Sequence, residues 1–166
     1  MKVWIDADAA PWEVKETVFR AARRLKFETV MVANSSLALP PNAPTVSMVT
    51  VAAGANIADR YIVTHSQPGD LVITADIPLA AELVAKQVMV VDPRGDEHTA
   101  DNIQSRLSMR DFLDGMRGAG TLSGGARPYD NRDKKKFAAV LDRYLAKAHS
   151  SSVTRKKTSS NDPDSA

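Results

Sequence analysis

The stretch that decides the fold is Met1-Lys-Val-Trp-Ile-Asp-Ala-Asp-Ala-Ala-Pro-Trp12, at the start of the sequence. Its apolar run ends abruptly in Asp6 and Asp8, and Pro11 follows at once. A buried strand that stops on carboxylates, with a helix start just behind it, is typical of an acidic site at a sheet edge. Asp6 and Asp8 would share a face of a continued strand and repel one another unless a cation or proton lies between them. The alternative is structural: Asp8 is a turn residue or helix cap, and Asp6 merely ends the strand.

The next thirty or so residues predict a parallel sheet. Apolar residues recur at helical spacing from Pro11 to Lys26, and residues 28–33 form a second apolar run. A strand, a helix and a strand in this order form a βαβ unit, which requires a right-handed crossover between parallel strands.

The rest of the chain continues the alternation of strands and helices. We expect strands over 46–51, 71–75 and 87–91, and helices over 55–66, from Pro78 onward, over 100–116 and over 130–148. A Gly-rich break at 115–128 precedes the last helix. The expected fold class is therefore α/β, with three α/β/α layers and a mainly parallel central sheet. One domain would span 1–148, followed by a disordered polar tail at 149–166.

Composition excludes several classes of protein. The 166 residues are 43% hydrophobic and 25% charged, as in a soluble globular domain. No apolar run reaches about 18 residues and the N-terminus lacks a signal-peptide pattern, so we expect no membrane association and a cytoplasmic address. The absence of cysteine excludes disulfides, a thiol nucleophile and a thiolate metal site. Nothing in the sequence predicts an oligomeric state.

Charge is distributed unevenly between the two parts of the chain. Residues 1–100 contain 9 Lys and Arg against 12 Asp and Glu, whereas residues 101–166 contain 13 against 8. The basic part could bind a polyanion such as RNA. A solvated surface of mixed charge explains the same counts.

Acids follow three of the expected strands and predict a metal site. Asp6, Asp76 and Asp92 each come directly after an apolar run, and Asp59 lies on the helix expected over 55–66. Ligands of open α/β sheets bind beyond the carboxyl ends of the strands, where Asp6, Asp8 and Asp76 would converge. An oxygen-only cluster without Cys or paired His suits Mg²⁺ or Mn²⁺ and disfavours zinc. Such an ion polarises a phosphoryl oxygen and lowers the pKa of an attacking water.

Each acid also has a structural interpretation. Asp76 stands where a helix N-cap belongs, Asp59 could be a surface acid, and Asp92 precedes a proline in a turn.

Three further residues are candidates for substrate binding. Thr74 and Asn34 lie at strand ends near the same edge, and Arg127 belongs to the Gly-rich break. Thr74 could orient a carboxylate or be a structural hydroxyl, and Arg127 could meet backbone phosphates.

Seven segments together resemble the bacterial YaiI/YqxD family, in order from about residue 2 to residue 145. They are Ile5-Asp-Ala-Asp-Ala-Ala-Pro11, Val32-Ala-Asn34, Val72-Ile-Thr-Ala-Asp-Ile-Pro-Leu-Ala80, Asp92-Pro-Arg-Gly95, Met109-Arg-Asp-Phe112, Gly124-Gly125 and Phe137-Ala-Ala-Val-Leu-Asp-Arg143. This family is regarded as similar to PIN-like domains, whose better-known members are metal-dependent ribonucleases. The resemblance implies a PIN-like fold in which Asp6 and Asp76 are the strand-end acids and Asp59 is the helix-borne acid. Asp8 is typical of this family alone, and Ala10 stands where the family usually has a cysteine.

Three functions remain open at this point. The first is a Mg²⁺- or Mn²⁺-dependent nuclease, acting on RNA before DNA, with Asp6, Asp8, Asp59 and Asp76 as catalytic residues and metal ligands. The second is a non-catalytic RNA- or protein-binding module in which the acids are structural. The third is a phosphatase of haloacid-dehalogenase type, for which Asp6-Ala-Asp8 would supply nucleophile and general acid. No downstream lysine with a following acidic pair supports the third.

Overall fold

β1 (Val3–Asp6) is an interior strand of a six-stranded sheet in the order β3-β2-β1-β4-β5-β6. The computed structural model describes residues 1–120 and 127–158. The other strands are β2 (Thr29–Ala33), β3 (Val46–Thr50), β4 (Leu71–Ile73), β5 (Met89–Val91) and β6 (Glu97–His98). All neighbouring pairs are parallel except β5 with β6. The predicted mainly parallel sheet is confirmed.

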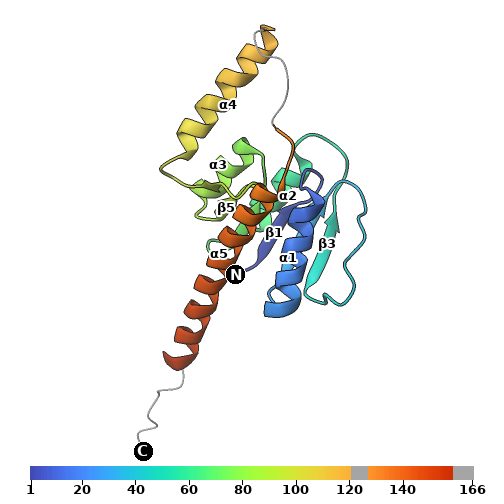
Figure 1. Cartoon of the computed structure of the whole chain (residues 1–166), viewed down its shortest axis with the longest axis vertical. Helices are drawn as coiled ribbons and strands as arrows, with labels where there is room; N and C mark the ends of the chain where they lie inside the picture. The colour runs from blue at the N-terminus through green and yellow to red at the C-terminus, as the bar shows by residue number, and fades with distance from the viewer. Residues whose placement is uncertain (121–126, 159–166) are drawn as a thin grey trace, which may run out of the picture.

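Helices cover both faces of the sheet and complete three layers (Figure 1). They are α1 (Trp12–Leu25), α2 (Ile57–His65), α3 (Ile77–Ala85), α4 (Ile103–Gly118) and α5 (Asn131–Thr158). α1 and α5 pack together on one face. α2 and α3 pack on the other, and α4 contacts α3.

Alternation along β1 divides its side chains between the two cores. Val3 and Ile5 are fully buried in the core that α1 and α5 cover. Trp4, which is 3% exposed, lies in the opposite core with α2 and α3. Burying a side chain of this size is worth about 1.5–3 kcal/mol, so both layers stabilise the position of β1. Asp6 is therefore delivered to a fixed place at the end of the strand.

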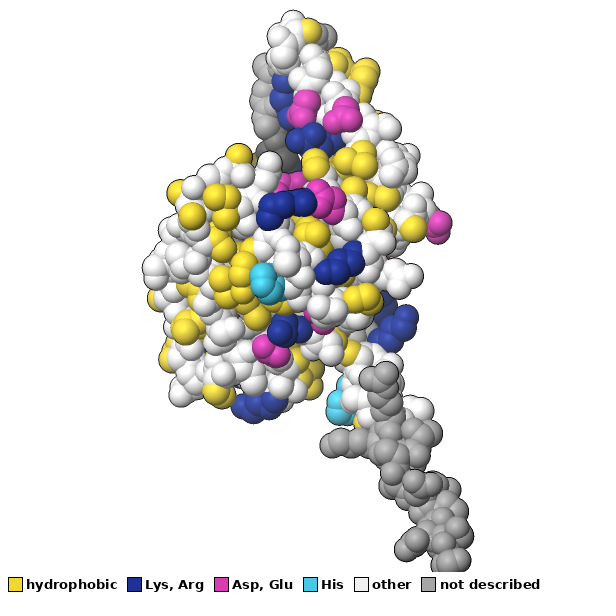
Figure 2. Space-filling model, turned by 180° about the vertical axis from the view of Figure 1, so that it is seen from behind, with side chains coloured by type: hydrophobic (Ala, Val, Ile, Leu, Met, Phe, Trp, Pro, Cys, Tyr) yellow, Lys and Arg dark blue, Asp and Glu magenta, His cyan; other side chains and the backbone are white. Residues whose placement is uncertain are grey.

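The last two helices differ from the sequence expectation. Ile103 is the one buried residue of α4, and Met109 and Phe112 are exposed, because this helix extends away from the body of the domain (Figures 1 and 2). α5 continues to Thr158, ten residues past the helix end expected at about residue 148. In this polar stretch, Ser150, Ser151 and Thr154 donate hydrogen bonds to backbone carbonyls one turn earlier in the helix. Residues 121–126 of the expected Gly-rich break and 159–166 of the expected tail lie outside the described residues.

The turn after β5 is held by the side chain of Asp92. Oδ1 of Asp92 accepts hydrogen bonds from the backbone N–H groups of Arg94 and Asp96, each at 2.9 Å. Gly95 follows with φ +84° and lies against the backbone of Lys136 and Phe137 in α5. Asp92 is thus a turn acid and supports the antiparallel strand β6, which the sequence did not predict. None of the described helices is long and apolar enough to cross a membrane.

We predict that Gly95→Ala destabilises the fold much more than Gly69→Ala. Both glycines have a positive φ, which costs an alanine about 1–2 kcal/mol. Only at Gly95 would the added Cβ stand 2.8 Å from backbone atoms of α5, and such overpacking costs about 1–3 kcal/mol more. Urea unfolding of the two variants measures the difference. Equal losses would contradict the close approach of the β5–β6 turn to α5.

Candidate functional site

The candidate site lies where the sheet changes its direction of winding. β1 pairs with β2 on one side and with β4 on the other, and the chain then proceeds outward in both directions. At such a point the loops after neighbouring strands diverge and leave a crevice beyond their carboxyl ends. Asp6 is the last residue of β1, and Thr74 directly follows β4.

Thr74 joins the two strand ends through its hydroxyl. Its Oγ1 donates a hydrogen bond to Oδ2 of Asp6 at 2.9 Å and accepts one from the backbone N–H of Asp76 at 3.1 Å. The residue is 1% exposed, so these partners hold it away from solvent. Thr74 therefore orients Asp6 and fixes the start of the loop that presents Asp76.

The side chain of Asp76 caps a helix and also interacts with a second acid, Asp59. Its Oδ1 accepts a hydrogen bond from the backbone N–H of Leu79 at 3.0 Å and caps α3, where Pro78 stands in the first turn. The structural interpretation of Asp76 is correct in this respect. The same side chain also forms a hydrogen bond with Asp59 of α2.

Asp59 and Asp6 have perturbed acidity. Burial, followed by the negative charges of Asp76 and Asp6 and by the Asp76 hydrogen bond, raises the pKa of Asp59 to about 6. Burial also raises the pKa of Asp6, against the hydrogen bond from Thr74, and the charges of Asp76 and Asp8 add to the rise. The structure thus brings Asp6, Asp59 and Asp76, from β1, α2 and the β4–α3 loop, into one interacting cluster.

The sign of this perturbation makes the cluster a source of instability above pH 6. Between an ordinary pKa of 3.8 and about 6, the folded chain retains a proton on Asp59 that the unfolded chain has lost. Folding is consequently less favourable as the pH rises through this window. In the described residues no Lys or Arg forms an ion pair with Asp6, Asp59 or Asp76, and Arg60, next to Asp59, is paired with Glu82.

Asp8 stands at the rim of this cluster. Its exposed side chain accepts a hydrogen bond at 2.8 Å from the backbone N–H of Asn34, the residue after β2. Pro11 precedes α1 without a side-chain cap, so Asp8 is not the cap of that helix. Its contact instead ties the β1–α1 loop to the end of β2, and its charge reaches Asp6.

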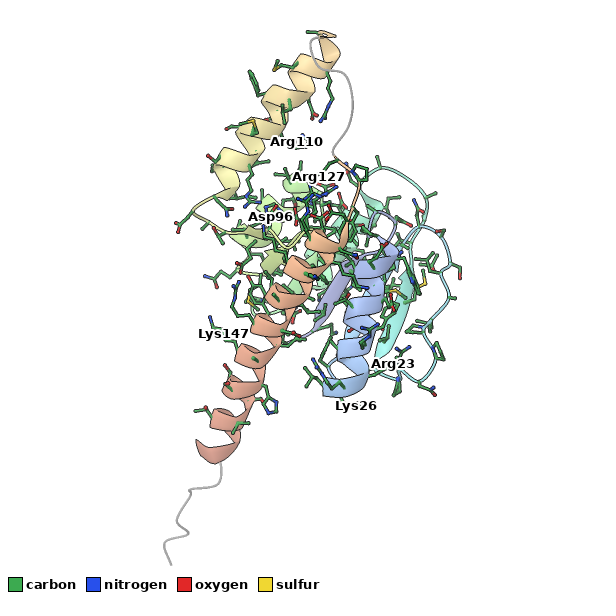
Figure 3. All side chains as sticks on the ribbon, viewed as in Figure 1. Arg23, Lys26, Asp96, Arg110, Arg127 and Lys147 are labelled. Atoms are coloured by element: carbon green, nitrogen blue, oxygen red, sulfur yellow. The ribbon has the colours of Figure 1, made fainter. Side chains whose placement is uncertain are left out.

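Arg127 binds to a residue of α5 and not to Asp6, Asp59 or Asp76. Its guanidinium donates to both carboxylate oxygens of Asp133, at 2.8 and 2.6 Å, beside the start of α5 (Figure 3). These hydrogen bonds lower the pKa of Asp133 to about 2. Asp133 also forms an ion pair with Arg94, whose Nη1 lies 2.8 Å from Oδ2 of Asp133. The structure therefore does not join Arg127 to Asp6, Asp59 or Asp76.

Among the described residues, no group of three or more His, Asp or Glu side chains is placed so that it could hold a metal ion. The predicted site residues also omit Trp12, whose indole is 64% exposed at the start of α1. In the sequence, Trp12 is recognisable only as a large aromatic residue directly after the proline of the first motif.

Comparisons with known proteins agree with the order of these motifs. The model of the family described as "Uncharacterized BCR, YaiI/YqxD family" matches residues 4–147. A UPF0178 protein of Myxococcus xanthus (strain DK1622) is 49% identical over 147 residues, which cover 89% of this chain and 95% of that protein. A UPF0178 protein of Shewanella baltica (strain OS223) is 47% identical over 146 residues, which cover 88% and 97%. No solved structure matches this chain.

The matched region contains β1 to β6 and all four acids, so the sheet edge described above belongs to the part shared with these relatives. On this evidence, the chain belongs to the YaiI/YqxD family.

Proposed function

We propose that this protein is a divalent-cation-dependent phosphodiesterase that cleaves RNA at the carboxyl edge of β1 and β4. One observation supports the proposal above all. Asp6, Asp59 and Asp76 interact at the switch point of the sheet, and no Lys or Arg in the described residues forms an ion pair with them; the charge of Arg60 lowers the pKa of Asp59 only in part. Clustered carboxylates of this kind are relieved by a shared proton or by a bound cation.

The donor chemistry fits a hard cation. All the candidate ligands are carboxylate oxygens, which Mg²⁺ and Mn²⁺ prefer. Mg²⁺ usually keeps several water ligands and binds through one or two carboxylates together with substrate phosphates. A site of that kind needs only one or two protein carboxylates, so it does not require three acids placed to hold a metal ion, a group that the described residues lack. Asp6 and Asp76 would bind the ion directly. Asp8 and Asp59 would be the other carboxylates beside it.

The residues then have distinct roles. A Mg²⁺ or Mn²⁺ ion bound here supplies positive charge to a phosphoryl oxygen and increases the acidity of water. Thr74 keeps Asp6 in one orientation through the 2.9 Å hydrogen bond. Asp59, which interacts with Asp76 and Asp6, would accept a proton from water at this site. Asn34, at the rim, and Arg127, which is bound to Asp133 of α5, remain proposed contacts for the RNA backbone.

A second function is favoured by a specific observation. No three acidic or His side chains in the described residues are placed to hold a metal ion, which favours a chain that binds RNA without cleaving it. Its acids would then be structural, as the cap formed by Asp76 already is. RNA binding that is unaffected by chelation, without turnover, would distinguish this module from the enzyme.

We predict that Asp76→Asn lowers the pKa of Asp59 from about 6. The substitution removes a negative charge and the hydrogen bond that both raise this pKa, whereas the larger effect of burial remains. Asparagine is also a good N-cap, so α3 should be preserved. NMR titration of the Asp59 carboxyl carbon measures the shift. Asp111→Asn, on the exposed face of α4, is the control, and equal pKa values in all three proteins would contradict the cluster.

We further predict that Asp6→Asn abolishes cation-dependent cleavage of single-stranded RNA. Cleavage should fall by at least about a hundredfold, the order of effect expected when a group that stabilises transition-state charge is removed. The assay compares wild type and variant with Mg²⁺, with Mn²⁺ and with EDTA, and Asp101→Asn at an exposed position controls for the loss of charge. Full cleavage by a pure Asp6→Asn preparation would refute the assignment. Trapping of an aspartyl-phosphate analogue at Asp6 would instead favour a phosphatase.

A further inference from the structure

A groove lies between α1 and the segment that follows β2. Five residues of α1 recur at helical spacing along one wall: Trp12, Lys15, Glu16, Phe19 and Arg23. The opposite wall is the segment Leu37–Pro41, and Met31 contributes to the lining. The cavity has a volume of about 480 Å³, within the range of about 300–1,000 Å³ that is usual for ligand pockets.

The walls of this groove are held together by hydrogen bonds. The guanidinium of Arg23 donates twice to the carbonyl oxygen of Pro41, at 3.1 and 2.9 Å. Figure 3 shows Arg23 on the side of α1 that faces away from α5. On the other wall, the backbone N–H of Leu37 donates to Sδ of Met48 at 3.2 Å. The groove is therefore a formed feature and not a gap between loose segments.

Trp12 is an aromatic surface at the mouth of the groove. Its ring meets Phe19 edge to face, with centroids 6.4 Å apart and planes at 71°. Phe19 is 3% exposed, so a buried residue fixes the orientation of an indole that is itself 64% exposed. Exposed tryptophans held in this way are typical platforms for stacking.

The groove is connected through the chain to the strand end that carries Asp6 and Asp8. Trp12 begins α1 immediately after the loop that contains Asp8, and the hydrogen bond from Asn34 to Asp8 joins that loop to the segment forming the other wall. Lys15, one turn further along α1, forms no ion pair with any described residue and offers a positive charge at the groove. An aromatic platform combined with a cation is the combination that binds a base and its phosphate in single-stranded nucleic acids.

We propose that this groove binds a nucleobase of single-stranded RNA, stacked on Trp12, with Lys15 meeting the adjacent phosphate. The occupant is chosen because the groove combines an aromatic face with a cation, and because Trp12 follows the loop that leaves the edge at which phosphodiester cleavage is proposed. The assignment to RNA rests on the proposed function. Trp12 acts in binding and not in the chemical step, since it lies beyond the acidic cluster.

Binding is measured in EDTA, so that it does not depend on cleavage. A fluorescein-labelled octa-adenylate RNA is titrated with the protein, and anisotropy gives the Kd. Trp12→Ala should weaken binding about 5- to 100-fold, the range expected for losing one stacked base. Trp12→Phe should stay within about fivefold of wild type, because it keeps an aromatic face. Phe112→Ala removes an aromatic ring of similar exposure, 61%, from α4 and should have no effect.

Fluorescence gives an independent readout with an unlabelled oligomer. Trp4, which is 3% exposed, is the other tryptophan of the chain. RNA should quench the emission of the wild type, and this quenching should disappear in Trp12→Phe while binding persists. Lys15→Ala should lower the dependence of log Kd on log salt by about one unit.

Several results would overturn the inference. They are an unchanged Kd in Trp12→Ala, an equal loss in Trp12→Ala and Phe112→Ala, or the absence of quenching. A dimer that Trp12→Ala dissociates, with unaltered RNA affinity, would show that a second copy occupies the groove. Trp12-dependent binding without cleavage would refute only the phosphodiesterase, whereas cation-dependent cleavage with an unaltered Kd in Trp12→Ala would refute only this inference.

Discussion

The parallel pairing of β1 with both β2 and β4 is the constraint on which the rest of the structure depends. Val3 is paired with Thr29 on one side and with Leu71 on the other, and Ile5 with Ile73. This register leaves Asp6 level with Thr74, so the 2.9 Å hydrogen bond between them follows from the strand pairing. The two cores fix β1 from opposite faces, and a shift by one residue would exchange them. The position of the acidic edge is therefore a result of packing in the sheet.

The carboxylates at the two ends of β1 have opposite surroundings. At the amino end, the carboxylate of Asp70 is 8% exposed and accepts hydrogen bonds from the backbone N–H groups of Lys2 and Gln67 and from Nε1 of Trp4, at 2.9–3.1 Å. At the carboxyl end, burial raises the pKa of both Asp6 and Asp59, and the charge of Asp76 adds to the rise in each. The first acid is fully bonded and stabilises the fold, whereas the second group remains repulsive. Repulsion that the fold relieves only in part is a reason to infer a ligand there.

The sequence predicted those parts of the fold that depend on apolar patterns. The five parallel strands are short apolar runs between polar turns, and the stripe of α5 at Phe137, Leu141 and Leu145 is buried as expected. β6 was missed because Glu97 and His98 are polar and are recruited to the sheet by the turn at Asp92. The length of α5 was missed because residues 149–154 are exposed and mostly polar, so no buried apolar stripe marks the helix there.

For the candidate site, the sequence predicted which residues lie at the strand ends but not which partners they bind. Strand ends are visible in a sequence, so Asp6, Thr74 and Asp76 could be placed together, but the partners that decide a side chain's role come from distant segments. Arg127 is bound to Asp133, and Asp8 to Asn34, through contacts that no local pattern encodes. Trp12 and Phe112 illustrate the same point, since their exposures are similar. Phe112 lies on a helix that extends from the body, whereas Trp12 stands at a groove whose second wall is fixed by Arg23 and Pro41. A ligand site is distinguished from an exposed aromatic residue by that second wall, which only the tertiary structure supplies.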